Sequence, residues 1–200
     1  MIESKLLQSG LTKIAGVDEA GRGACAGPLV IAAVILRDIT DAKLAKVRDS
    51  KELKPGMREE LFEVIVDLAH DYSIIEISAA EIDVIGLHKA NLEGMRRAIN
   101  ALEVEPEYVL TDGYEISGLS TESLAIWKGD QVAISISAAS ILAKVYRDRI
   151  MINLDRQYPG YHFADHKGYV TRTHERSLNE LGVTAIHRKS YANIQALINK

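Results

Sequence analysis

The chain has 200 residues, 47% of them hydrophobic, and a formal net charge of −4. That length fits one domain, or one domain with a small appendage, and that composition excludes a disordered or fibrous protein. No apolar run reaches the roughly 18 residues that a membrane span requires, and the N-terminus lacks the basic-then-apolar pattern of a secretory signal, so we expect no membrane contact.

Five short runs have the apolar, β-branched composition of buried strands: 14–18, 28–36, 73–77, 108–111 and 124–127. Helical spacing predicts a helix that Pro55 opens, a stretch that Ser78 caps and Gly86 interrupts before it continues to 102, an amphipathic helix over 138–152, and two short helices near 172–181 and 190–198. This order predicts an α/β fold with a mixed central sheet flanked by helices. Strand signals cease after Tyr158, so we divide the chain into a sheet-bearing domain at 1–157 and a helical C-terminal extension at 158–200.

Four acidic residues stand at or just after the ends of predicted strands: Asp18, Glu19, Asp112 and Asp130. Acids at strand ends can converge on a crevice at one edge of an open α/β sheet. Adjacent carboxylates at the end of a buried strand need a compensating cation, and Mg²⁺ and Mn²⁺ take oxygen ligands. Taken singly, Asp112 and Asp130 beside their glycines are more simply turn residues, so the metal interpretation depends on the set.

The segment Gly21-Arg22-Gly23 follows the first two acids at once. Glycines let the backbone approach a ligand closely, and a guanidinium suits phosphate. A dinucleotide-binding fingerprint is a poor match, because the spacing to Gly27 is one residue too long and a strand rather than a helix follows.

The charge is distributed unevenly along the chain. Residues 1–140 hold 14 lysines and arginines against 23 aspartates and glutamates, whereas residues 141–200 hold 10 against 5. A basic C-terminal quarter on an acidic body favours a polyanion docked along one face, although a chance fluctuation would give the same asymmetry.

Several single residues have both a functional and a plain structural interpretation. Lys51 would meet a phosphate or lie in a solvated loop, and Tyr169 would stack on a sugar or base or pack in the core. Lys144, Arg147 and Asp148 share a helix face and would make surface pairs.

Cysteine and histidine spacing indicates neither a disulfide nor a zinc site. The single cysteine, Cys25, excludes an internal disulfide, fits a reducing cytoplasm and is expected to be a small buried side chain. Four histidines near the C-terminus lack the spacing of a compact zinc site, so we expect them on the surface or facing phosphates: His162, His166, His174 and His187.

Taken in order, these segments resemble the type 2 ribonuclease H family, most closely bacterial ribonuclease HII. The matching motifs are Gly16-Val-Asp-Glu-Ala-Gly-Arg-Gly23 with Ala26-Gly-Pro28, Asp49-Ser-Lys51, Thr111-Asp-Gly113, Lys128-Gly-Asp130, the helix 137–148, His166-Lys-Gly-Tyr169 and His187-Arg-Lys-Ser190. They span residues 14 to about 191. Ser137 and Ala24-Cys25 depart from the family's usual residues, and neither is among the expected ligands.

The resemblance implies a ribonuclease H-like fold and a metal-dependent endonuclease. Such an enzyme cleaves the RNA strand of RNA–DNA hybrids and nicks 5′ of single ribonucleotides embedded in duplex DNA, leaving 3′-hydroxyl and 5′-phosphate ends. It serves ribonucleotide removal in DNA replication and repair, and we expect a cytoplasmic monomer whose partners are these nucleic acids.

The resemblance also implies a role for each matching residue. Asp18, Glu19, Asp112 and Asp130 become the catalytic ligands of Mg²⁺ or Mn²⁺, two ions being bound with substrate. The loop Gly21-Arg22-Gly23 senses the ribose 2′-hydroxyl, which distinguishes RNA from DNA. Tyr169 packs against the sugar at the RNA–DNA junction. Phosphate contacts are expected from Lys51, Lys144 and Lys167.

Two other functions fit parts of the pattern. A non-catalytic binder of hybrid or junction nucleic acid would use the basic tail and Tyr169 equally well, but it gains nothing from four carboxylates that repel phosphate. A metal-dependent phosphatase or nuclease for another substrate, such as a Holliday junction, would use the same acids. Only a comparison of substrates separates these enzymes.

Overall fold

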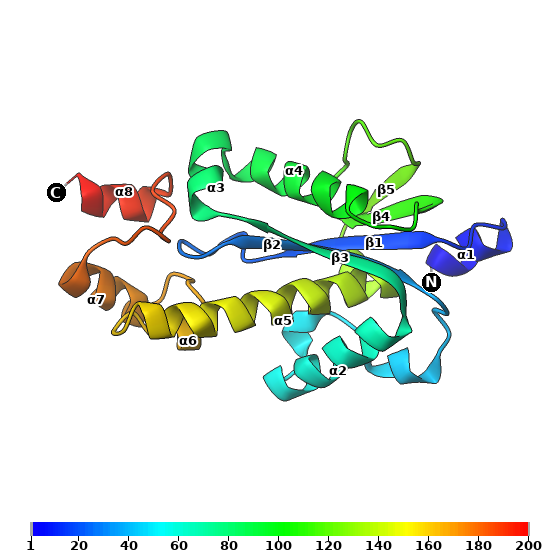
Figure 1. The fold of residues 1–200 in the computed structure, drawn as a ribbon, viewed down its shortest axis with the longest axis horizontal. Helices are drawn as coiled ribbons and strands as arrows, with labels where there is room; N and C mark the ends of the chain where they lie inside the picture. The colour runs from blue at the N-terminus through cyan, green and yellow to red at the C-terminus, as the bar shows by residue number, and fades with distance from the viewer. Residues whose placement is uncertain (1, 200) are drawn as a thin grey trace.

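A five-stranded mixed sheet occupies the centre of the protein (Figure 1). The structure is a computed structural model that describes residues 2–199. Its strand order is β3-β2-β1-β4-β5, with β1 at Ile14–Ala20, β2 at Leu29–Leu36, β3 at Ala69–Ile77, β4 at Tyr108–Asp112 and β5 at Ser123–Ile126. The first three strands pair antiparallel, and β4 and β5 run parallel to β1.

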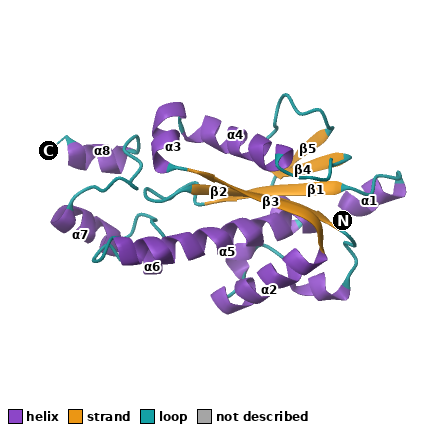
Figure 2. Cartoon of the chain, viewed as in Figure 1, coloured by secondary structure: helices purple, strands orange, loops and turns teal. Residues whose placement is uncertain are grey.

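Helices cover both faces of the sheet (Figure 2). On one face lie α2 (Pro55–Leu68) and α5 (Ile134–Gln157), and on the other lie α3 (Ala79–Ile85) and α4 (Leu87–Asn100). Strand β2 explains this layering, because all eight of its residues are apolar and buried. Alternate side chains of β2 enter the two hydrophobic cores, one against α2 and α5 and the other against α4.

The remaining elements are short. They are α1 (Ile2–Gln8), the 3₁₀ turns η1 (Ala42–Lys46), η2 (Ser50–Glu52) and η3 (Gly129–Gln131), and the C-terminal helices α6 (Phe163–His166), α7 (Arg172–Leu181) and α8 (Ala192–Ile198). The C-terminal helices pack around buried Cys25, Ala26 and Phe163. A main-chain hydrogen bond from Arg188 N to Cys25 O, 2.9 Å long, ties this region to the loop between β1 and β2. None of the helices in residues 2–199 is long and apolar enough to cross a membrane.

The predicted α/β architecture with a mixed sheet is confirmed, and so is the burial of Cys25. Each predicted strand is present, although β3 begins at Ala69, four residues before the predicted 73. The short elements α1, η1, η2, η3 and α6 were not predicted from the sequence, because none is long enough to show a period.

Candidate active site

The parallel strands β1 and β4 bring the predicted acids together. Val17 of β1 pairs with Thr111 of β4, so Asp18 and Asp112 occupy the next position on adjacent strands. Asp112 Oδ1 accepts a hydrogen bond of 2.7 Å from Gly129 N, which fixes the turn that carries Asp130. Strand register and one side-chain bond therefore place three of the acids at one end of the sheet.

A cavity of about 340 Å³ opens at this end of the sheet. It is bordered by the acids Glu19, Asp49, Asp112 and Asp130 and by Lys51, Tyr114, Trp127 and Lys128. A second cavity of about 260 Å³ shares Glu19 and Lys51 with the first, and its other walls come from Gly21-Arg22-Gly23, Lys144 and Tyr169. The two cavities are therefore adjacent, and Glu19 and Lys51 stand at their common border.

Burial and mutual repulsion raise the pKa values of the acids. Burial first, and then the charges of Glu19 and Asp112, raise the pKa of Asp18, whose side chain is only 5% exposed. Burial and the charge of Asp112 raise the pKa of Glu19 to about 7. Burial and the charges of Asp49 and Asp112 raise that of Asp130 to about 6. Carboxyl groups in this state gain stability from an added cation.

The residues present fit a hard divalent cation in an open site. Glu19 Oε2 is buried and has no hydrogen-bond partner in the described part of the chain, so one ligand atom is free. Every acidic donor at the cavity is a carboxylate oxygen, which Mg²⁺ and Mn²⁺ prefer. Within residues 2–199, no three acidic, histidine or cysteine side chains already form a closed cage. An open arrangement suits Mg²⁺, which keeps several waters and takes substrate phosphate as ligand.

The glycine–arginine loop packs closely against α5 and the C-terminal region. Gly21 has φ +89°, and a Cβ there would lie 1.8 Å from Arg147 Nε, so only glycine fits. The Arg22 guanidinium lies 5.1 Å from the centroid of the Tyr114 ring. The Arg22 carbonyl accepts hydrogen bonds from the guanidinium of Arg188 and the hydroxyl of Tyr191.

We expect Gly21→Ala to lower cleavage by at least about 10-fold, since the new methyl group displaces either the loop or Arg147. Gly56→Ala is a suitable control, because nothing lies within 4 Å of the position that its Cβ would take. Steady-state rates of the nuclease activity that the motifs imply, measured on the two purified variants, check this. Equal rates for both variants would show that the loop tolerates displacement.

Tyr169 lies at the rim of the second cavity, 38% exposed. The Arg147 guanidinium stands 5.5 Å from its ring centroid. A Cβ on Gly23 would lie 3.8 Å from Tyr169 Cε1, so the ring and the glycine loop face the same space.

The three predicted phosphate-contacting lysines differ in position. Lys51 has an 80% exposed side chain, with Nζ 3.9 Å from Asp130 Oδ2. Lys144 lines the second cavity, and its ammonium is paired with Asp148 at 2.6 Å. Lys167 is not among the residues that line either cavity, and its ammonium donates to the carbonyl of Ala164.

Sequence reasoning missed the site roles of two residues. Asp49 borders the acidic cavity and is nearly buried, but it follows no strand, so the strand-end argument did not select it. The matching segment Asp49-Ser-Lys51 was the available signal. Trp127 borders the same cavity and was assigned only to a strand end.

The expectation that Arg147 makes a surface pair is wrong. Its side chain is fully buried, and its guanidinium donates to the carbonyls of Ala26, Pro28 and Lys167. Arg188 is also fully buried and donates to Gly27 O and Arg22 O. Both arginines therefore join the glycine loop to the C-terminal region, and they leave fewer cations of the basic quarter for a polyanion.

The expectation of surface histidines is also wrong for two of the four. His174 and His187 are buried, and their Nε2 atoms are 3.1 Å apart. His187 Nδ1 accepts a hydrogen bond from Thr184 N, so its Nε2–H donates to His174, whose Nδ1–H donates to the Tyr169 carbonyl. This series of hydrogen bonds requires both imidazole rings to be neutral. It arises from tertiary packing, which the spacing of histidines in the sequence does not reveal.

This histidine pair predicts a loss of stability in acid. Burial lowers the pKa values of His174 and His187 to about 4, below the ordinary 6.5. The native protein then binds fewer protons than the unfolded chain between about pH 4 and 6.5, so the free energy of unfolding falls as the pH falls through that window, by roughly 3 kcal/mol per histidine. Denaturant titrations across this range measure it. His187→Gln should reduce the slope, while exposed His162→Gln should not; equal slopes in all three proteins would contradict the expectation.

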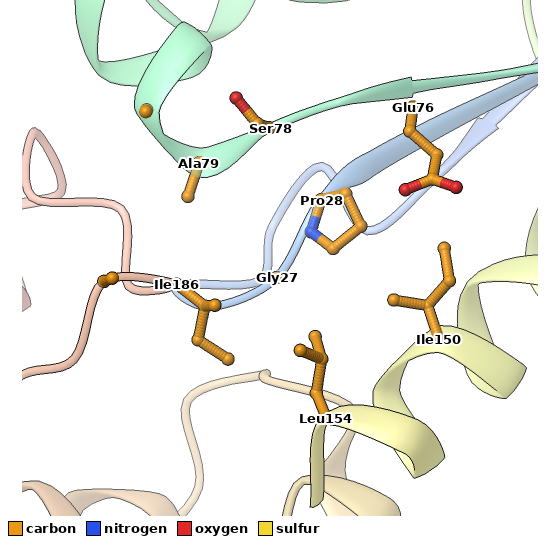
Figure 3. Close-up of a pocket in the computed structure, with 10 residues that line it drawn as sticks. Gly27, Pro28, Glu76, Ser78, Ala79, Ile150, Leu154 and Ile186 are labelled. Carbon is orange, nitrogen blue, oxygen red and sulfur yellow. The ribbon is translucent and has the colours of Figure 1, made fainter. Parts of the chain in front are cut away.

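An apolar cavity of about 320 Å³ lies away from the acids (Figure 3). It is enclosed by the start of β2, by α3 and α5, and by Ile186 in the loop between α7 and α8. Its walls include Pro28, Ala79, Ile150 and Leu154. Glu76 is the one charged side chain among the residues that line it, so this cavity lacks the chemistry of the acidic site.

A mixed five-stranded sheet between helices, with acids gathered at the ends of its parallel strands, defines the ribonuclease H-like class of proteins. A family model described as Ribonuclease HII matches residues 15–194. The chain belongs to the ribonuclease HII family of hydrolytic endoribonucleases, which confirms the resemblance seen in the motifs.

Individual relatives agree with this assignment. A Ribonuclease HII of Rhodococcus erythropolis (strain PR4) is 54% identical over 195 residues, which cover 98% of this chain and 86% of that protein. The crystal structure of ribonuclease H2 from Pyrococcus horikoshii OT3 superposes with a TM-score of 0.81 at 29% identity, covering 94% of this chain and 97% of that one. Bst-RNase HIII in complex with Mn²⁺ shares the fold, with a TM-score of 0.68 at 19% identity over 94% of this chain and 69% of that one.

Proposed function

We propose that this protein is a metal-dependent endonuclease that cleaves the RNA strand of RNA–DNA hybrids and nicks 5′ of single ribonucleotides in duplex DNA. The products carry 3′-hydroxyl and 5′-phosphate ends. The observation that supports the proposal is the adjacent pair of cavities, one lined by acids and the other by the glycine–arginine loop and Tyr169. Carboxylates suited to divalent ions thus adjoin a loop suited to contact a ribose.

The acids Asp18, Glu19, Asp112 and Asp130 would hold two ions, Mg²⁺ or Mn²⁺, together with the substrate phosphate. The raised pKa values and the free Glu19 Oε2 support this assignment, as does the Mn²⁺ complex of the related ribonuclease HIII fold. When bound, such ions supply a polarised water as nucleophile and positive charge at the leaving 3′-oxygen.

The other residues bind and orient the strand. Gly21 and Gly23 allow the backbone to approach the ribose 2′-hydroxyl, and Arg22 beside them adds a fixed cation. Tyr169 packs on the sugar at the RNA–DNA junction. Lys51, at the boundary of both cavities, meets a phosphate. Because the reacting groups are held in place, positioning and electrostatics supply most of the rate.

Residues 1–157 would form the catalytic domain and 158–200 the substrate-binding extension, which contributes Tyr169. The substrates assign the enzyme to ribonucleotide removal during DNA replication and repair. We propose a cytoplasmic monomer, and the free thiol of Cys25 is consistent with a reducing compartment.

A panel of substrates tests the proposal. It contains a DNA duplex with one ribonucleotide, an RNA–DNA hybrid, a four-way DNA junction and the matching all-DNA duplex, each with Mg²⁺ or Mn²⁺. We expect cleavage of the first two alone. Binding of the hybrid without cleavage would indicate a non-catalytic binder, and preferential cutting of the junction would indicate a different nuclease; either result overturns the proposal.

A further inference from the structure

Trp127 is the single tryptophan of the chain, and it is 82% exposed at the border of the acidic cavity. A lone exposed apolar side chain needs no explanation in itself. Indole is nevertheless the largest apolar side chain, and here it stands beside Asp112 and Asp130, where the substrate must lie. Its position therefore calls for a functional account.

The backbone that carries Trp127 is firmly fixed. Gly113 N donates to Ile126 O at 2.9 Å, and Gly129 N donates to Asp112 Oδ1 at 2.7 Å, so bonds to the end of β4 and its turn hold both sides of Trp127. Lys128 has φ 54°, the left-handed conformation that non-glycine residues seldom adopt. Strain of this kind persists where the surroundings impose it, and it occurs often at ligand sites.

The two adjacent cavities offer a path for a nucleic-acid strand. They share Glu19 and Lys51, and Tyr169 borders one while Trp127 borders the other. A strand that crosses the acids therefore passes one aromatic side chain in each cavity. The exposed Lys128 next to Trp127 supplies a cation at the second aromatic position.

We propose that Trp127 is a substrate-binding residue whose indole stacks on a base or sugar of the cleaved strand, beyond the acids from Tyr169, with Lys128 facing a neighbouring phosphate. The inference rests on the proposed function, and it extends the binding site by one nucleotide position. Stacking of a base on an aromatic side chain tolerates any sequence, which suits an enzyme that must act at any ribonucleotide.

Fluorescence gives a direct test, because all tryptophan emission of this chain comes from Trp127. The intact protein is titrated with an RNA–DNA hybrid, and separately with a DNA duplex containing one ribonucleotide, in chelator to prevent cleavage. We expect the emission to change and acrylamide quenching to fall at the concentrations at which anisotropy of a labelled duplex shows binding. Unchanged emission and quenching on a saturated protein would overturn the inference.

Variants separate binding from folding. Trp127→Ala should raise KM by roughly 5- to 100-fold with kcat within about twofold, and Trp127→Phe should restore most of the loss. Leu124→Ala is the matched control, since Leu124 is exposed on β5, the strand that ends just before Trp127, but lines neither cavity. An unchanged KM for Trp127→Ala, or an equal rise for Leu124→Ala, would overturn the inference. Wild-type protein that cleaves the duplex while Trp127 stays accessible leaves the proposed function intact.

Discussion

Asp18→Asn should abolish cleavage and at the same time make the protein more stable. We expect the nicking rate to fall by roughly 100-fold or more, because the change removes one of the carboxylates that we propose hold the catalytic ions. Burial and the charges of Glu19 and Asp112 raise the pKa of Asp18 above its ordinary 3.8. The native state then holds this proton more tightly than the unfolded chain does, so stability falls as the pH rises above the ordinary pKa of 3.8, and burying Asp18 costs stability at pH 7. Asparagine removes this cost.

Nicking assays and thermal unfolding without added metal measure the two effects. The melting temperature should rise by at least about 2 °C at pH 7, with less gain at pH 4, because a lower pH favours the protonated form of Asp18. Asp67→Asn is the control, since that side chain is 71% exposed and pairs with Lys43 at 3.7 Å; neither rate nor stability should change. An Asp18→Asn enzyme that keeps its rate, or that melts below the wild type, would refute this assignment.

Arg147→Met should destabilise the protein by about 2–5 kcal/mol and weaken recognition of the RNA–DNA junction in the substrate. The change leaves the carbonyls of Ala26, Pro28 and Lys167 without their shared donor, although it also removes a buried charge that has no carboxylate partner among its hydrogen bonds. The Tyr169 ring loses its cation as well. Denaturant unfolding gives the stability change, and kcat/KM on a duplex with one ribonucleotide gives the effect on recognition.

Arg149→Met provides the comparison, because Arg149 lies on the same helix and pairs with Glu59 and Glu63 on the surface. That change should cost less than about 1 kcal/mol. Arg147→Lys keeps the charge but not the forked donor geometry, so it should fall between the wild type and Arg147→Met. If Arg147→Met unfolds at the same denaturant concentration as the wild type, the buried guanidinium does not hold these loops together.

The sheet and the acids were predictable from the sequence for the same physical reason. Residues of β2 are apolar without alternation, as a strand buried on both faces requires. Parallel strands end at one edge of a sheet, so acids after β1 and β4 were expected to meet. In both cases the order of apolar and acidic residues within a short segment was enough for the prediction.

The supports of the site could not be predicted in this way. On a helix, Arg147 next to Asp148 looks like half of a surface ion pair, and only the approach of the Gly21 loop and the Tyr169 loop makes it buried. His174 and His187 lie 13 residues apart, and their bond exists only because the C-terminal segments fold against each other. Contacts between segments that are distant in the sequence determine whether such side chains are buried and which partners they bind.

The central claim is that the acids at the end of the sheet hold divalent ions, and that the enzyme so loaded cleaves the phosphodiester bond 5′ of a ribonucleotide. The most direct measurement follows nicking of a DNA duplex with one ribonucleotide in chelator, in Mg²⁺ and in Mn²⁺, and identifies both product ends. We predict no product in chelator, and a 3′-hydroxyl and a 5′-phosphate with metal. Product formed in chelator, or a 2′,3′-cyclic phosphate end, would mean that the ribose hydroxyl attacks without these acids, and it would contradict the claim.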